Sequence, residues 1–77
     1  MPFTVTEIHA FIATGKDGEE GICAFYEERN NVMLPMICAD PARLKFLLPI
    51  ARDIAKASGQ KISLVRFSNR EIIEEEI

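Results

Sequence analysis

The sequence has no tryptophan, one tyrosine, one histidine and two cysteines. Two cysteines without a Cys-x-x-Cys pair do not build a disulfide framework. With one histidine, the four nitrogen or sulfur ligands of a zinc site are hard to assemble. The low content of tryptophan and tyrosine leaves few side chains on which nucleic-acid bases can stack. These absences predict a protein with no metal and no cofactor.

Long hydrophobic runs and catalytic signature motifs are also missing. No apolar stretch approaches the ~20 residues that cross a bilayer, and the start, MPFTVTEIHAF, lacks the pattern of a secretion signal. The glycines of TGKDGEEG lack the spacing of a phosphate-binding loop, and no serine lies in a nucleophile-elbow motif. The sequence therefore predicts a cytoplasmic, non-enzymatic protein without a membrane span.

What is present is a short chain with the composition of a globular domain. It has 77 residues, of which 48% are hydrophobic and 27% charged. A chain of this size buries only ~60% of its unfolded surface, so small domains often gain stability from a partner. We expect a single α+β domain over residues 1–70, followed by an acidic C-terminal tail over residues 71–77.

The net charge of −3 is distributed in three blocks. Residues 1–39 carry two basic and six acidic side chains, and residues 40–70 carry seven basic and two acidic ones. The last seven residues carry four glutamates. A basic block therefore lies between two acidic ones.

Four segments have the β-branched and aromatic residues and the turn-forming neighbours of strands. They are residues 3–15, 21–28, 32–38 and 60–68. Asn30 and Asn31 predict a two-residue turn, because asparagine tolerates a positive φ. That turn would place Tyr26 opposite Pro35 and Cys23 opposite Cys38. Pro35 would then occupy a position without a hydrogen bond to its neighbour, on a strand at the sheet edge.

Residues 40–59 have the pattern of an amphipathic helix. Asp40 is a good N-cap, Pro41 suits the first helical position and Gly59 is a typical C-terminal stop. Leucine, isoleucine and alanine side chains recur on one stripe at helical spacing. Pro49 removes one backbone hydrogen bond near the middle, so we expect a kink.

The expected architecture is a two-layer β-β-β-α-β fold, with one kinked helix on a four-stranded, mostly antiparallel sheet. The strand order is predicted as 3-2-1-4. Alternate residues are apolar on both faces of the predicted strands, whereas one helix covers only one face. A second copy of the chain is the simplest cover for the other face, which includes Val65 and Phe67. The alternative is that loops and the tail fold over that face.

Two other functions fit parts of the sequence. Six basic side chains form a possible nucleic-acid-binding stripe along the helix and the last strand: Lys45, Arg52, Lys56, Lys61, Arg66 and Arg70. Their other interpretation is a solvated surface. A thiol-dependent or ligand-binding enzyme around His9, Cys23 and Cys38 would need a cysteine next to the histidine. The simpler interpretation of both cysteines is buried, reduced thiols.

The tail, EIIEEEI, allows two conformations. Ser68 and Glu71 match a capping box, which predicts a short helix. As a strand, the tail would place Glu71, Ile73, Glu75 and Ile77 on one face. We expect it either to dock on the basic block, in its own or a sister chain, or to stay a solvated terminus.

The second half of the chain resembles short uncharacterised bacterial proteins that share the pattern PIA…IA…G…I-LVRFS-RE. The resemblance covers about half of the chain and implies no activity and no site residue. Together these features predict a small interaction or regulatory protein that acts as a homodimer on a further protein partner. Weak nucleic-acid binding is the alternative, and the enzyme is the third possibility.

Overall fold

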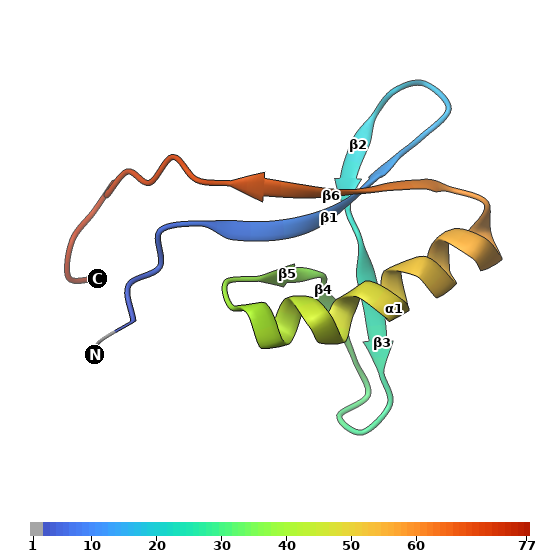
Figure 1. Cartoon of the computed structure of the whole chain (residues 1–77), viewed down its shortest axis with the longest axis horizontal. Helices are drawn as coiled ribbons and strands as arrows, with labels where there is room; N and C mark the ends of the chain where they lie inside the picture. The colour runs from blue at the N-terminus through green and yellow to red at the C-terminus, as the bar shows by residue number, and fades with distance from the viewer. Residues whose placement is uncertain (1–2) are drawn as a thin grey trace.

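The computed structural model describes residues 3–77, and it has the predicted α+β architecture with one helix and antiparallel strands. The elements follow the chain as β1 (Ile8–Thr14), β2 (Glu20–Ile22), β3 (Ala24–Glu27), β4 (Val32–Pro35), β5 (Ile37–Cys38), α1 (Pro41–Ser58) and β6 (Lys61–Phe67). β1 and β6 form the long axis of the molecule, with α1 packed beside them (Figure 1).

β1 is the central strand of the larger sheet. On one side it pairs with β6 from Ile8↔Phe67 to Thr14↔Lys61. On the other side it pairs with β2 through its second half and with β5 through its first half. The predicted neighbours of the first strand are therefore confirmed for β2 and β6. Pairing between β1 and the end of the third predicted strand was not foreseen.

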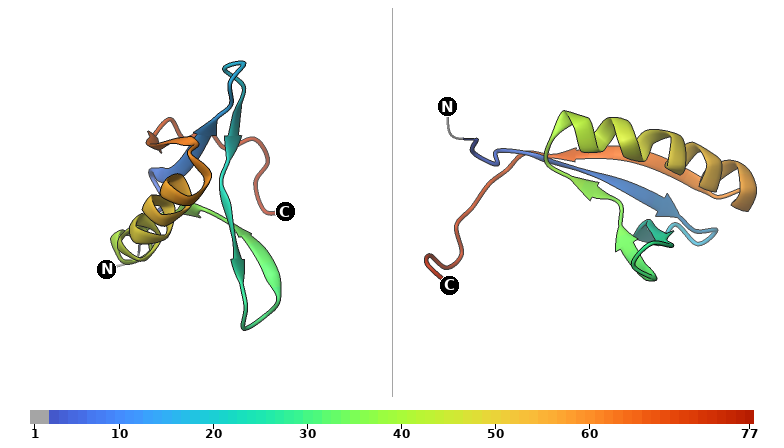
Figure 2. Two further views of the ribbon diagram at one scale, coloured as in Figure 1. Left: turned by 90° about the vertical axis from the view of Figure 1, so that its right-hand side faces the viewer. Right: turned by 90° about the horizontal axis from the view of Figure 1, so that it is seen from below.

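The second and third predicted strands are each divided in two, because both turn away from β1 at the same place. Three backbone hydrogen bonds close a ring there. Phe11 N–H donates to the Met36 carbonyl at 3.1 Å, Met36 N–H to the Cys23 carbonyl at 2.8 Å, and Cys23 N–H to the Phe11 carbonyl at 2.8 Å. We call this ring of Phe11, Cys23 and Met36 the backbone junction. Beyond it, β3 and β4 form a separate two-stranded hairpin (Figure 2).

The register of this hairpin differs from the prediction by two residues. Tyr26 pairs with Met33 and Glu27 with Val32, so the turn has four residues instead of two. The reason is the Glu27 carboxylate, which accepts the N–H groups of Arg29 at 3.2 Å and Asn30 at 2.8 Å and so closes a wider turn. Asn31 has the expected positive φ, at 56°.

Pro35 still occupies a position without a hydrogen bond to the neighbouring strand. Met36 donates to Cys23, and hydrogen-bonded pairs alternate along an antiparallel ladder, so the adjacent pair Ala24↔Pro35 is a non-bonded one. Among the described residues β4 pairs only with β3, which confirms that this proline lies on an edge strand.

The helix begins and ends where the sequence predicts. The Asp40 carboxylate accepts the Arg43 N–H at 2.8 Å, and Pro41 is in the first turn. Gly59 adopts the left-handed conformation (φ 71°) and donates its N–H to the Ala55 carbonyl at 2.9 Å. The exposed Pro49 lies inside the helix, which continues through it from residue 41 to residue 58.

The core lies between α1 and one face of the sheet. Its buried members come from β1, β5, the backbone junction and the middle of the helix: Phe11, Met36, Cys38, Leu47 and Ala51. Half-buried side chains from β3, α1 and β6 pack around them. Residues 3–7 are not in a strand, although the prediction began the first strand at residue 3, because β6 ends opposite Ile8.

Candidate functional site

The surface of the sheet opposite α1 is mainly apolar, with polar side chains at the end where Thr14, Glu20 and Lys61 meet. Phe11 and Cys38 face the helix, so their strand neighbours Ala10 and Ile37 face the other way. The register places further apolar side chains on the same surface. We call it the open face, and it comprises Ile8, Ala10, Ile12, Ile22, Ala24, Tyr26, Met33, Pro35, Ile37, Val65 and Phe67.

Several large side chains of the open face are exposed to solvent. The exposed fraction is 53% for Tyr26, 62% for Met33 and 51% for Phe67. Ala10 and Ile12, in the central strand, are buried among larger neighbours. The helix covers only the other side of the sheet, as expected from the sequence. Large apolar side chains gathered on one exposed surface make the open face the candidate contact region of this structure.

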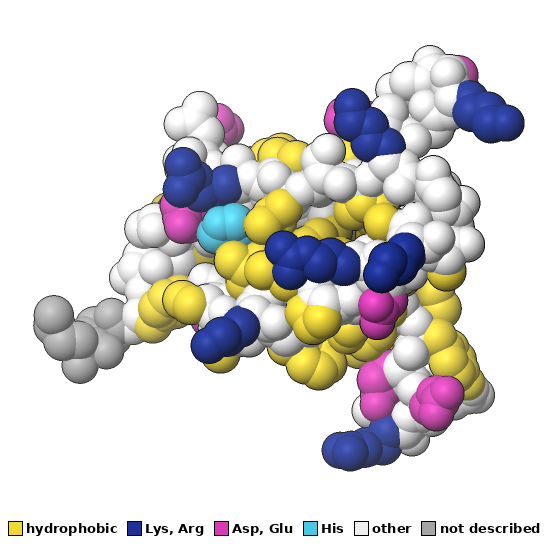
Figure 3. Space-filling model, turned by 45° about the vertical axis from the view of Figure 1, so that its right-hand side comes forward, with side chains coloured by type: hydrophobic (Ala, Val, Ile, Leu, Met, Phe, Trp, Pro, Cys, Tyr) yellow, Lys and Arg dark blue, Asp and Glu magenta, His cyan; other side chains and the backbone are white. Residues whose placement is uncertain are grey.

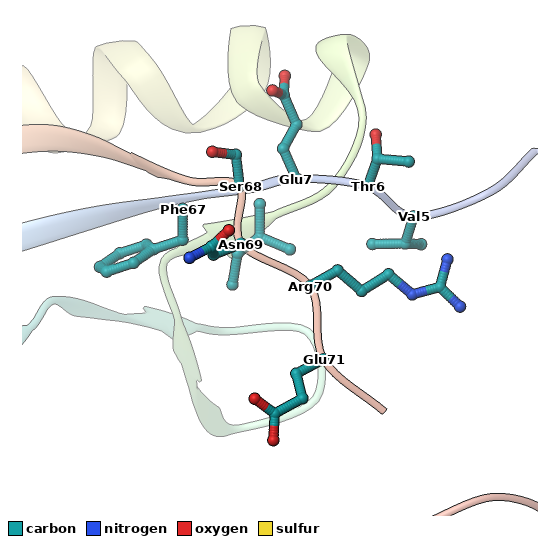
Figure 4. Close-up of a pocket in the computed structure, with 9 residues that line it drawn as sticks. Val5, Thr6, Glu7, Phe67, Ser68, Asn69, Arg70 and Glu71 are labelled. Atoms are coloured by element: carbon teal, nitrogen blue, oxygen red, sulfur yellow. The ribbon is translucent and has the colours of Figure 1, made fainter. Parts of the chain in front are cut away.

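One end of the open face is hollowed. A cavity of about 270 Å³ lies between the segments at the ends of β1 and β6, and it is lined by Val5, Thr6, Glu7, Ile8, Phe67, Ser68, Asn69, Arg70 and Glu71. Its charged side chains diverge: Glu7, Arg70 and Glu71 point in three different directions (Figure 4). Glu7 is paired with Arg66 instead, at 3.9 Å. The hollow therefore has an apolar floor without converging catalytic groups.

The cysteines do not face each other, so the predicted Cys23–Cys38 pairing is wrong. Cys23 lies in the backbone junction beside Met36, and Cys38 pairs with His9 on β1. The shift in the hairpin register is the cause. The pairing of Cys38 with His9 brings together the two residue types of a nucleophile and its base, which is the arrangement the enzyme hypothesis needs.

The thiols themselves are not activated. Burial raises the pKa of Cys23. Burial also raises the pKa of Cys38, with a further increase from the Asp40 carboxylate that the Arg43 guanidinium partly offsets. A raised thiol pKa lowers the fraction of thiolate, which is the nucleophilic form. The geometry therefore favours structural thiols over a cysteine nucleophile.

The six predicted basic residues do not lie on one surface. Lys45, Arg52 and Lys56 are exposed on a single flank of α1. Arg66 shares the helix side of β6 with Ile62, whereas Lys61 shares the open face with Val65; Arg70 lies beyond the strand at the hollow. In Figure 3 two Lys or Arg side chains lie next to each other near the centre of the view, and the others stand apart from them.

One basic residue that the predicted stripe left out has a structural contact. The Arg43 guanidinium lies 5.9 Å from the ring centre of Phe25 and 5.2 Å from that of Phe46. The two rings meet edge to face, with centres 6.3 Å apart. This cluster joins α1 to the hairpin. Sequence spacing alone did not reveal it, because Phe25 lies far from the helix along the chain.

The tail forms neither the helix nor the strand that its sequence allows. Residues 71–77 have no regular secondary structure, and Ile73 has an exposed fraction of 91%. Within residues 3–77 the only ion pair is Arg66–Glu7, so the tail is not docked on the basic block of its own chain. Ser68 caps no helix, because a seven-residue segment is too short to form a stable helix by itself.

Residues 3–77 contain no group of three or more histidine, cysteine, aspartate or glutamate side chains that could hold a metal ion. In the same part of the chain, no helix has the length and apolarity needed to cross a bilayer. Comparison with protein-family models, curated proteins and solved structures found no match to this chain. The resemblance of the second half to short bacterial proteins stays a prediction.

Proposed function

We propose that this chain is a non-enzymatic interaction protein that acts as a homodimer. The observation that carries the proposal is the open face, on which Tyr26, Met33 and Phe67 are each more than half exposed. Burying such side chains stabilises an interface by roughly 25 cal/mol per Å² of apolar area, before the cost of association. A chain with a small core gains from that burial.

The raised thiol pKa values of Cys23 and Cys38, together with the diverging charges of the hollow, favour binding over catalysis. A second copy is the simplest partner because a two-fold axis presents the same apolar surface twice. A further protein would bind the assembled dimer, with the dimer as its regulatory or adaptor subunit.

The test compares two phenylalanines of equal exposure. Phe67 is on the open face and Phe46 is on the helix, and each has an exposed fraction of 51%. We expect sedimentation equilibrium to find a dimer, and Phe67→Ser to raise its dissociation constant by roughly one order of magnitude or more. Phe46→Ser, which disturbs only the contact with Phe25 and Arg43, leaves the dissociation constant unchanged. A monomeric protein, or equal effects of the two substitutions, would refute the proposed homodimer.

A further inference from the structure

The backbone of β6 has an open edge. Within residues 3–77 its only strand partner is β1. Phe11 of β1 directs its N–H and C=O away from β6, into the backbone junction. Because these groups alternate in direction along a strand, Ala10 and Ile12 direct theirs toward β6. Their partners Val65 and Ser63 are therefore the hydrogen-bonded ones.

It follows that Ile62, Leu64 and Arg66 direct their backbone N–H and C=O groups to the free edge. No other element of the described chain bonds them. The side chain of Leu64, on the same strand, has an exposed fraction of 44% although it faces the helix side. An open edge of this length readily accepts another strand.

The open edge lies beneath a basic flank of the helix. Arg43 and Phe46 mark the flank of α1 that contacts the hairpin. Lys45, Arg52 and Lys56 are roughly 130° away around the helix axis, on the opposite flank. The hairpin and β6 lie on opposite sides of β1, so this second flank runs along β6. The helix and β6 run antiparallel (Figure 1).

This charge excludes β6 of a second copy as the added strand. A two-fold pairing of β6 with itself would bring two basic helix flanks together, which is unfavourable. An acidic extended segment fits instead. The chain contains an acidic segment without regular secondary structure, residues 71–77, which carries four glutamates and makes no ion pair with its own described residues.

The tail projects away from its own fold (Figures 1 and 2). In its own chain, residues 68–71 line the hollow beside residues 5–8 and lead away from the edge of β6. The ten residues from 68 to 77 can reach about 33 Å when extended. Residues 68–70 supply about 10 Å of this length as a connection and residues 71–77 supply the rest as a strand, so the tail reaches a copy that packs beside the end of β6.

We propose that residues 71–77 of a second copy add as a strand to the open edge of β6. Alternate residues of the added strand face opposite sides of the sheet. The arrangement that matches the charges places Glu74 and Glu76 on the helix side, next to the basic flank. Ile73 and Ile77 then lie on the opposite side and extend the apolar surface at Val65. The proposal rests on the homodimer proposed above and names the segment that each copy contributes.

The first test is amide hydrogen exchange on the full chain by NMR, at concentrations above and below dimer formation. We expect the amides of Ile62, Leu64 and Arg66 to be protected in the dimer and to exchange at least roughly tenfold faster after dilution. Ser63 and Val65 stay protected at both concentrations, because they bond β1. Protection of the amides of Ile62, Leu64 and Arg66 at every concentration would mean that the tail binds its own β6. It would contradict the proposal that the two copies exchange their tails.

The second test uses two variants with the same change in charge. Replacing Glu74 and Glu76 with lysine speeds the exchange of the Leu64 amide in the dimer by roughly tenfold, because both side chains face the basic flank. Replacing Glu71 and Glu75 with lysine leaves that rate close to the unmodified one. Equal effects of the two variants would mean general charge attraction without strand addition, and would overturn the proposal.

Sedimentation of the same samples separates this proposal from the homodimer. A dimer in which the amides of Ile62, Leu64 and Arg66 are unprotected would contradict strand addition by the tail. It would remain consistent with the proposed homodimer. A monomer at every concentration overturns both.

Discussion

At the scale of single residues, burial decides the chemistry of the two thiols. Cys38 is buried in the core and Cys23 is half-buried in the backbone junction. Both are surrounded mainly by apolar side chains, which favour the neutral form. The pairing of Cys38 with His9 shows that two reactive residue types can be neighbours without an activated nucleophile, since the thiolate is the reactive species.

The raised pKa values predict how the thiols respond to pH. A thiol whose pKa is raised by folding above the usual value of 9.0 stabilises the fold while it is protonated. That contribution is complete below pH 9 and is lost as pH rises through the folded-state pKa. We expect urea unfolding to give a lower free energy at pH 10.5 than at pH 8, and Cys38→Ala to reduce this difference.

The same residues predict slow labelling by a thiol reagent at pH 7 in native buffer, and fast labelling in urea. Fast labelling of the native protein would contradict the structural role and would revive the thiol-dependent enzyme as a hypothesis.

At the scale of elements, the helix follows its sequence signals at both ends. The Asp40 cap and the left-handed Gly59 depend on local chemistry alone, so sequence reasoning predicts them. The hairpin register was not predictable in the same way. It depends on the Glu27 carboxylate, which accepts two backbone N–H groups of the turn. Asn30 and Asn31 signal a turn, but they do not fix its length.

Pro49 provides a test of the helix interior. It is exposed and lacks the N–H that would bond the carbonyl of Lys45. We expect Pro49→Ala to raise the free energy of unfolding by about 1–3 kcal/mol. The control is Pro41→Ala, at the first helical turn where an N–H has no intrahelical partner, and it gives little change. Chemical denaturation measures both, and equal effects would contradict the explanation.

At the scale of the whole molecule, the alternation of apolar residues predicted a sheet with two apolar faces, and the structure has one face covered by α1 and one open. This pattern was predictable because it depends only on the two-residue period of a strand. The division of two strands at the backbone junction was not, because it depends on three segments that meet only in the fold. The arrangement of the basic side chains also needed the fold, since Lys61 and Arg66 lie on opposite sides of β6.

If two copies of the chain associate, the thermal stability of the protein depends on its concentration. A dimer that binds only in the folded state shifts the unfolding equilibrium by mass action. We therefore expect the midpoint temperature to rise by several degrees over a hundredfold increase in concentration. The Phe67→Ser variant loses that dependence, whereas Phe46→Ser keeps it at a lower midpoint. A midpoint independent of concentration in the unmodified protein would argue for a monomer.

The backbone junction allows the β3–β4 hairpin to vary in length without changing the larger sheet. Its root is held by Phe11, Cys23 and Met36, while nothing in the larger sheet depends on where the hairpin ends. Two residues added to both β3 and β4 would lengthen the hairpin and preserve every pairing with β1. One residue added to a single strand would reverse which of its side chains face the helix. Natural variation in this region should therefore occur as balanced insertions and deletions, and a peptide epitope inserted at the four-residue turn should leave the rest of the fold intact.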